Sequence, residues 1–229
     1  MTNSLTLALE GSTYEGSVAL IQGGEVIAEN TLHDDDGGIP VAGRGERLLP
    51  AVAECIEAAG AGAGEIRRIV CGAGPGRFTS LRVAGAVAKG LATGYGAELY
   101  AISSLLLTVS AARPPLGEGE YLSVVDAMRG DWFAARVTIA PDGSVEQDGP
   151  AWILSGADLG AISRAEPNLQ IAGPGQRIDA RPHARGVTRL LSRIATDGPV
   201  DIASWEPDYG RLPEAEARRA SARERPSVR

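Results

Sequence analysis

The chain has 229 residues and a formal net charge of −7, with 44% hydrophobic and 22% charged residues. This length suits one large domain or two small lobes of ordinary globular composition. The acidic balance excludes binding to nucleic acid by bulk charge alone. No run reaches the ~18 apolar residues of a membrane span, and the N-terminus lacks the regions of a signal peptide. We therefore expect a cytoplasmic protein with no membrane partner.

Apolar runs predict a three-stranded meander at the N-terminus, over Leu5–Glu10, Gly16–Ile21 and Glu25–Leu32. Residues 33–43 combine three aspartates with glycines and a proline, which predicts a mobile loop. The following segment, Glu46–Ala59, repeats apolar residues at helical spacing and predicts a helix.

The centre of the chain predicts a strand, a glycine-rich loop and a helix. Ile69–Cys71 is a short apolar run, Gly72–Gly76 is the loop, and the helix should cover Thr79–Thr93 with Thr79 or Ser80 as its cap. A glycine loop before a helix is suited to bind an anion. However, a dinucleotide fingerprint would need glycine in place of Arg77, and no Gly-Lys-Ser/Thr occurs. An anion site and a turn without a ligand both remain open.

This central helix is unusually poor in side-chain bulk. Glycine inside a helix costs ~1 kcal/mol relative to alanine, so a close neighbour should compensate. Five residues at helical spacing form a nearly smooth strip: Leu81, Ala84, Gly85, Ala88 and Ala92. We expect this small-residue strip to receive a partner protein or a second copy, while Val83, Val87 and Leu91 face the chain's own core. The alternative is that the strip packs on the chain's own sheet.

The remaining elements follow a boundary marked by prolines and glycines at residues 114–119. Before it we expect a strand over Glu98–Ile102 and a helix over Ser103–Ala112. After it we expect strands near Tyr121–Val125, Trp132–Ile139, Ala151–Leu154 and Leu169–Ala172, and helices near Gly156–Ala165 and Gly186–Asp197.

The two halves of the chain carry a faint repeat. An apolar strand ends in a carboxylate at Glu10 and again at Asp126, each followed by a turn and a second strand. A Gly-Pro-Gly sequence follows a predicted strand at 74–76 and again at 173–175. The pattern predicts two α/β lobes of mixed sheet with packed helices, over residues 1–112 and 113–210, before a tail over 211–229.

A long motif carries a resemblance to a known family. The sequence GAGPGRFTSLRVAGAVAKGLA, from Gly72 onward, resembles the signature of the bacterial TsaB (YeaZ) family, with Arg77 for the usual Ser and Ser80 for the usual Gly. Three more stretches agree in order: Leu7–Glu10, Arg44–Pro50 and Glu206–Tyr209. Glu10 stands where the family usually has Asp, and Arg44 where it usually has His.

The resemblance implies an actin-like, ribonuclease-H-like (ASKHA) fold in two lobes. It also implies a subunit that binds and activates a TsaD-like catalytic subunit, with a TsaE-like ATPase, to form N6-threonylcarbamoyladenosine beside the anticodon of tRNA. The subunit would meet tRNA only through the complex and would form a homodimer when alone. The implied interface comprises Arg44, Glu46, Leu49, Leu81, Ala84, Gly85, Ala88 and Ala92. The implied vestigial phosphate-facing residues are Glu10, Gly74, Gly76 and Asp126.

Chemistry-bearing residues are few. The only histidines are His33 and His183, and the cysteines Cys55 and Cys71 are expected to be free core thiols. No His, Cys or carboxylate cluster has metal-ligand spacing. We therefore predict no catalytic residue, no metal and no cofactor of its own, with ATP or ADP at an interface of the complex left open. The alternatives are an autonomous nucleotide-binding or ATP-hydrolysing enzyme and a tRNA-binding module.

The tail from Arg211 onward holds six Arg and three Glu, a side-chain charge of +3. Two interpretations are open. It is either a solvated end of the chain or a basic arm that touches tRNA held by the partner.

Overall fold

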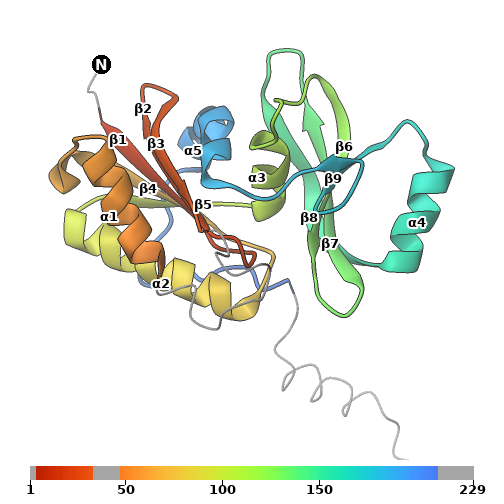
Figure 1. Ribbon diagram of the computed structural model, residues 1–229, viewed down its shortest axis with the longest axis horizontal. Helices are drawn as coiled ribbons and strands as arrows, with labels where there is room; N and C mark the ends of the chain where they lie inside the picture. The colour runs from red at the N-terminus through yellow and green to blue at the C-terminus, as the bar shows by residue number, and fades with distance from the viewer. Residues whose placement is uncertain (1–3, 33–46, 211–229) are drawn as a thin grey trace, which may run out of the picture.

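The protein forms two lobes, each built on a five-stranded mixed sheet (Figure 1). The computed structural model describes residues 4–32 and 47–210. The first sheet has the order β3-β2-β1-β4-β5 and consists of β1 (Leu5–Glu10), β2 (Ser17–Gln22), β3 (Glu25–Thr31), β4 (Ile66–Gly72) and β5 (Glu98–Ile102). The second has the order β10-β9-β6-β7-β8 and consists of β6 (Gly119–Asp126), β7 (Asp131–Ile139), β8 (Val145–Ser155), β9 (Gln170–Gly173) and β10 (Ile178–Asp179).

The two sheets repeat one plan. β1 pairs antiparallel with β2 and parallel with β4, and β6 pairs antiparallel with β7 and parallel with β9. Counted from the outer strand of each meander, β3-β2-β1-β4-β5 corresponds to β8-β7-β6-β9-β10. The predicted two lobes of mixed sheet are confirmed, and both Gly-Pro-Gly sequences follow the parallel neighbour of the first strand in each lobe.

Helices cover both faces of each sheet. The helical elements are α1 (Leu48–Ala58), η2 (Ala63–Glu65), α2 (Phe78–Tyr95), α3 (Ser104–Ser110), α4 (Gly156–Ala165), η3 (Ala184–Leu190) and α5 (Leu191–Asp197). One face of the first sheet packs against α1 and α2, and α4 covers the outer face of the second sheet (Figure 1).

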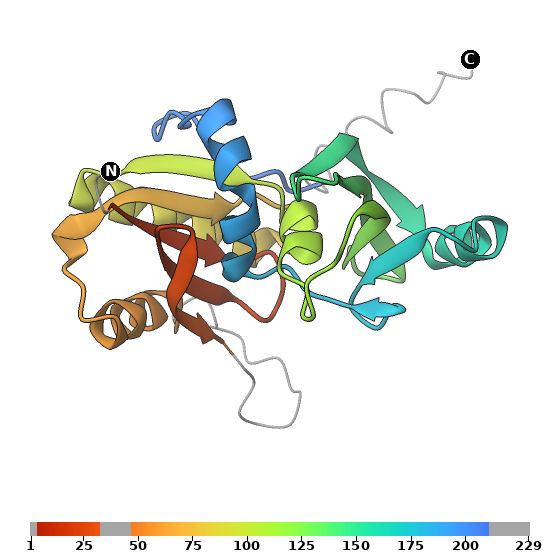
Figure 2. The same cartoon turned by 90° about the horizontal axis from the view of Figure 1, so that it is seen from above.

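Each helix between the sheets packs against the sheet of the other half of the sequence. α3 follows the first sheet in the sequence but packs against the second, whereas η3 and α5 follow the second sheet and pack against the first (Figure 2). Residues from Ala184 onward, which the sequence analysis assigns to the second lobe, therefore lie on the first. Their side chains join both sheets and α3 in one hydrophobic core between the lobes.

The element boundaries differ from the sequence-based ones in a few places. α2 begins at Phe78 with Arg77 as N-cap, and no side chain caps it, so the predicted cap at Thr79 or Ser80 is wrong. The predicted Gly186–Asp197 helix is a 3-10 helix followed by a short α-helix, and β10 was not predicted. Among the residues described, no helix is both long and apolar enough to cross a membrane.

Candidate functional site

The glycine loop after β4 is closed by contacts within the chain. Gly74 has a φ of +92°, and a side-chain carbon on it would lie 2.2 Å from the carbonyl oxygen of Asp208. A side-chain carbon on Gly76 would lie 2.4 Å from the carbonyl oxygen of Ser12. These positions require glycine because two other backbone segments pack directly onto the loop.

Backbone N–H groups that an anion would need are used inside the chain. The N–H of Gly74 donates to the hydroxyl of Ser104 at 3.1 Å, and the N–H of Arg77 donates to the carbonyl of Ser12 at 2.8 Å. The loop is therefore held by internal partners at two of the groups that a phosphate would contact.

Glu10, at the end of β1, is fully buried and hydrogen-bonded. Its carboxylate accepts from the backbone N–H of Ser12 and, at 2.9 Å, from the hydroxyl of Ser104. Burial raises the pKa of Glu10 above its ordinary value, outweighing the opposite effect of the hydrogen bonds from Ser12 and Ser104. A side-chain carbon on Gly72 would lie 1.9 Å from the carboxylate. Glu10 therefore occupies space that only glycine leaves free, and it joins β1 to the glycine loop through Ser104.

Asp126, the corresponding carboxylate of the second lobe, is exposed. Its Oδ1 accepts from the backbone N–H of Met128 at 2.7 Å. It lines a pocket of about 170 Å³ between the lobes, whose walls are Ser12, Thr13, Tyr14, Glu15, Arg77, Asp126, Pro174 and Arg181. The structure thus brings Asp126 to a pocket that Arg77 also lines, whereas Glu10 lies buried behind the glycine loop and does not line this pocket.

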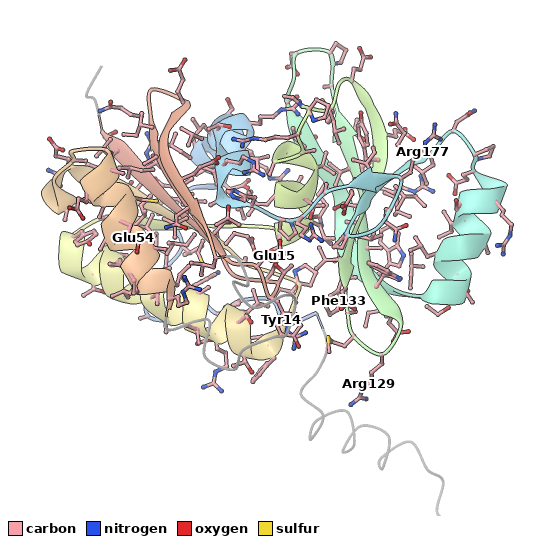
Figure 3. The ribbon with its side chains drawn as sticks, in the orientation of Figure 1. Tyr14, Glu15, Glu54, Arg129, Phe133 and Arg177 are labelled. Carbon is pink, nitrogen blue, oxygen red and sulfur yellow. The ribbon has the colours of Figure 1, made fainter. Side chains whose placement is uncertain are left out.

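Of the eight pocket residues, the sequence analysis singled out only Asp126 as a site residue. The Arg77 guanidinium lies 3.2 Å from the centre of the Tyr14 ring, and Arg181 pairs with Glu15 at 3.5 Å across the lobes. Figure 3 shows Tyr14 and Glu15 directed toward the space between the lobes. The replacement of the family's usual Ser by Arg77 was the one sequence signal for this arrangement.

The small-residue strip of α2 is not a free surface. Leu81, Ala84, Gly85, Ala88 and Ala92 are all buried, while Val83, Val87 and Leu91 are only partly buried. The predicted orientation of the helix is therefore wrong.

The physical reason is close backbone packing. A side-chain carbon on Gly11, just after β1, would lie 2.8 Å from Cβ of Ala84, and one on Gly85 would lie 3.1 Å from Pro207. The strip lets β1 and the C-terminal segment approach the helix.

Other predicted interface residues fall on or before α1. Leu49 is 50% exposed, whereas Leu48, Val52 and Cys55 of the same helix are buried. Arg44 and Glu46 lie outside the described residues, as do His33 and the predicted 33–43 loop.

The other chemistry-bearing groups have structural surroundings. Cys55 and Cys71 are free and buried, as expected, and burial raises the pKa of the Cys55 thiol to about 11. His183 accepts from the N–H of Arg185 at Nδ1, while Nε2 lies 2.9 Å from the hydroxyl of Thr31. Within residues 4–32 and 47–210, no group of three His, Cys, Asp or Glu residues is placed to hold a metal ion.

Known proteins match the chain in sequence. The model of the family TsaD: tRNA N6-adenosine threonylcarbamoyltransferase matches residues 22–147. The "tRNA threonylcarbamoyladenosine biosynthesis protein TsaB" of Haemophilus influenzae is 31% identical over 60% of this chain and 55% of its own length. The protein of that name from Escherichia coli is 30% identical over 57% of this chain and 53% of its own. The chain spans about half the length of these curated relatives.

Solved structures match nearly the whole chain. An uncharacterized protein with similarity to peptidase YEAZ, from Pseudomonas aeruginosa, has a TM-score of 0.72 at 25% identity and covers 91% of this chain and 100% of its own. YeaZ from Pseudomonas aeruginosa has a TM-score of 0.71 at 23% identity, over 90% and 99%, and shows the fold alone. The fold class is therefore that of the two-lobed, actin-like proteins. The chain belongs to the TsaD family, and its predicted resemblance to TsaB (YeaZ) proteins is confirmed.

Proposed function

We propose that this chain is a non-catalytic subunit of the machinery that forms N6-threonylcarbamoyladenosine in tRNA, binding and activating a TsaD-like catalytic subunit. The observation that carries the non-catalytic part is the internal hydrogen bonding of Glu10 to Ser12 and Ser104. This network fills the first-lobe position at which an actin-like enzyme would present a carboxylate to phosphates. The names of the TsaB relatives support the tRNA modification.

The proposed partner-binding surface is the outer side of α1 together with the exposed side of α2. Leu49 supplies an exposed apolar side chain there. The buried strip acts only indirectly, by fixing α2 against the sheet. The further proposed partners are a TsaE-like ATPase and, in isolation, a second copy of the chain. Contact with tRNA would go through the complex.

Two measurements test the proposal together. The first asks whether a purified TsaD-like protein from the same cell binds the chain, with Leu49→Asp as the disrupting variant and Ile153→Asp, an equally apolar exposed position on β8, as the matched control. The second asks whether the chain restores threonylcarbamoyladenosine, measured by mass spectrometry of tRNA nucleosides, in a bacterium depleted of its own TsaB. Failure of both would reject the proposed subunit.

The pocket between the lobes favours one alternative, an autonomous nucleotide-binding or ATP-hydrolysing enzyme. Asp126 and Arg77 both line it, and a carboxylate and a guanidinium are groups that could hold a metal and a phosphate. The test is ATP hydrolysis by the purified chain. Turnover that falls in Asp126→Ala would establish the alternative, and no turnover supports the non-catalytic subunit.

A further inference from the structure

A group of aromatic, methionine and arginine side chains lies beside the pocket between the lobes. It comprises Tyr14, Arg77, Phe78, Met128, Arg129 and Tyr209, called here the cleft-mouth patch. Tyr14, Phe78 and Met128 are 39%, 46% and 41% exposed. A single exposed residue such as Phe78 is common on protein surfaces. Aromatic, methionine and arginine side chains that contact one another are instead typical of protein interfaces.

Five of the six patch residues contact another member of the patch. Arg77 covers one face of the Tyr14 ring and its guanidinium lies 2.9 Å from Sδ of Met128. The Phe78 and Tyr209 rings pack with centroids 4.7 Å apart. These contacts order rotamer-rich side chains before any partner arrives, which reduces the entropy that binding would cost.

Four distant segments contribute to the patch: the turn after β1, the start of α2, the β6–β7 turn and the C-terminal segment. Gly210 joins the lobes at this point, since a side-chain carbon on it would lie 2.8 Å from Pro75 and 2.4 Å from Phe133. In Figure 3, Arg129 projects outward from the tip of the β6–β7 turn. Met128 and Arg129 have φ values of 68° and 61°, a conformation that non-glycine residues rarely adopt. A partner on the patch would contact both lobes.

The charge of the patch indicates the chemical class of its partner. Arg77, Arg82 and Arg129 lie in or beside it, and none of them is in an ion pair found among residues 4–32 and 47–210. The chain continues from Gly210 into a tail whose side chains carry +3. Like charge disfavours this tail as the occupant.

Two features disfavour nucleic acid. One face of Tyr14 is covered by Arg77, and Arg82 lies 5.4 Å from the Phe78 ring centre, so the faces on which bases stack are partly occupied. The carboxylates of Asp126 and Glu206 lie beside the patch and would repel a nucleic acid, which carries a phosphate at every nucleotide, whereas a peptide can place its few carboxylates at the arginines alone.

We propose that the cleft-mouth patch is a docking site for an acidic protein segment with an apolar anchor side chain. Arg77, Arg82 and Arg129 would pair with its carboxylates, and the anchor would pack on Phe78, Met128 and Tyr209. The inference goes beyond the proposed function, because the patch shares only the first residues of α2 with the proposed partner-binding surface, and it stands whether or not the chain serves tRNA modification.

The experiment uses the full chain and a library of random 12-residue peptides displayed on phage. We expect the selected peptides to combine Asp or Glu with Leu, Phe or Met. A synthetic copy should bind at least tenfold more weakly, by fluorescence anisotropy, to Phe78→Ala and to Arg129→Glu. Ile153→Ala, 43% exposed on β8, is the matched control and should change binding less than twofold. Circular dichroism and melting verify that each variant is folded.

Three results would overturn the proposal. Selected peptides without acidic residues would remove the charge argument. Equal binding to wild type, Phe78→Ala and Arg129→Glu would place the peptides elsewhere. Displacement of the peptide by a 12-nucleotide single-stranded RNA at lower concentration than by free peptide would identify the patch as a nucleic-acid surface. Because the assay contains no TsaD-like protein, its outcome is independent of the test of the proposed function.

Discussion

The two lobes share one strand order, but the carboxylate at the end of the first strand is buried in one lobe and exposed in the other. In the first lobe, Glu10 is buried against Gly72 and tied to Ser104. In the second, Asp126 is exposed and lines the pocket. The first lobe connects β4 to β5 through the long α2, whereas β9 reaches β10 through residues 174–177 alone. A duplicated architecture therefore keeps its topology while one carboxylate becomes part of the core and the other stays open to a ligand or partner.

The largest expected difference between the lobes comes from removing each carboxylate. Glu10→Ala leaves the N–H of Ser12 and the hydroxyl of Ser104 without an acceptor and opens a cavity. Each buried unsatisfied group costs about 1–3 kcal/mol, so we expect the free energy of unfolding to fall by about 3 kcal/mol or more. Asp126→Ala removes one exposed hydrogen bond and should cost less than about 1 kcal/mol. Urea unfolding of both variants measures the decrease in the free energy of unfolding. Equal decreases would contradict the structural role of Glu10.

The two Gly-Pro-Gly loops provide a matched pair. Gly76→Ala places a carbon 2.4 Å from the backbone oxygen of Ser12, and such overpacking costs about 1–3 kcal/mol. The corresponding Gly175→Ala meets nothing within 4 Å, so only its φ of +67° opposes it, at about 1 kcal/mol. Thermal melting should show the larger loss for Gly76→Ala. The reverse order would mean that the first loop can move away from Ser12.

These same elements show which features of the fold could be predicted from the sequence. The C-terminal ends of most strands, the repeated carboxylates and both Gly-Pro-Gly loops were predictable, because apolar period and turn residues are local signals. The start of β8, at Val145, was not. The orientation of α2 was not, because a helix of Gly and Ala suits both an exposed interface and close packing on a sheet.

Contacts far apart in the sequence decided the rest. Gly11 and Pro207 lie on the strip of α2, and neither signals this in its own segment. The exchange of α3 and η3 between the lobes is likewise a property of the whole topology. Arg77 could be noticed as unusual, but its position over Tyr14 required the structure.

The free energy of unfolding should depend on pH through Glu10. Burial raises the pKa of Glu10 from its ordinary value of 4.5, so the folded state holds its proton at pH values where the unfolded chain has released it. Stability from this group is fully present below about pH 4.5 and is lost as pH rises toward the raised pKa, at up to ~1.4 kcal/mol per pH unit.

The measurement is urea unfolding of wild type and Glu10→Gln at several pH values above this point. The uncharged glutamine should remove that decline, while the exposed control Asp126→Asn should leave it in place. If the free energies of unfolding of wild type and Glu10→Gln change with pH in the same way, the buried carboxyl does not take up a proton on folding.

The smallest expected effect concerns two ion pairs, Glu15–Arg181 between the lobes and Glu29–Arg185 between β3 and η3 on the first lobe. Glu15 and Arg181 are 40% and 47% exposed and meet at 3.5 Å, so their coupling in a double-mutant cycle should lie below ~1 kcal/mol and decrease with added salt. Glu29 and Arg185 are less exposed, at 27% and 23%. Burial raises the pKa of Glu29, but Arg185, His183 and Arg113 outweigh it and hold that pKa below its ordinary value. We expect the Glu29–Arg185 coupling to be larger and less sensitive to salt. Equal couplings would mean that the lower exposure of the Glu29–Arg185 pair does not strengthen it.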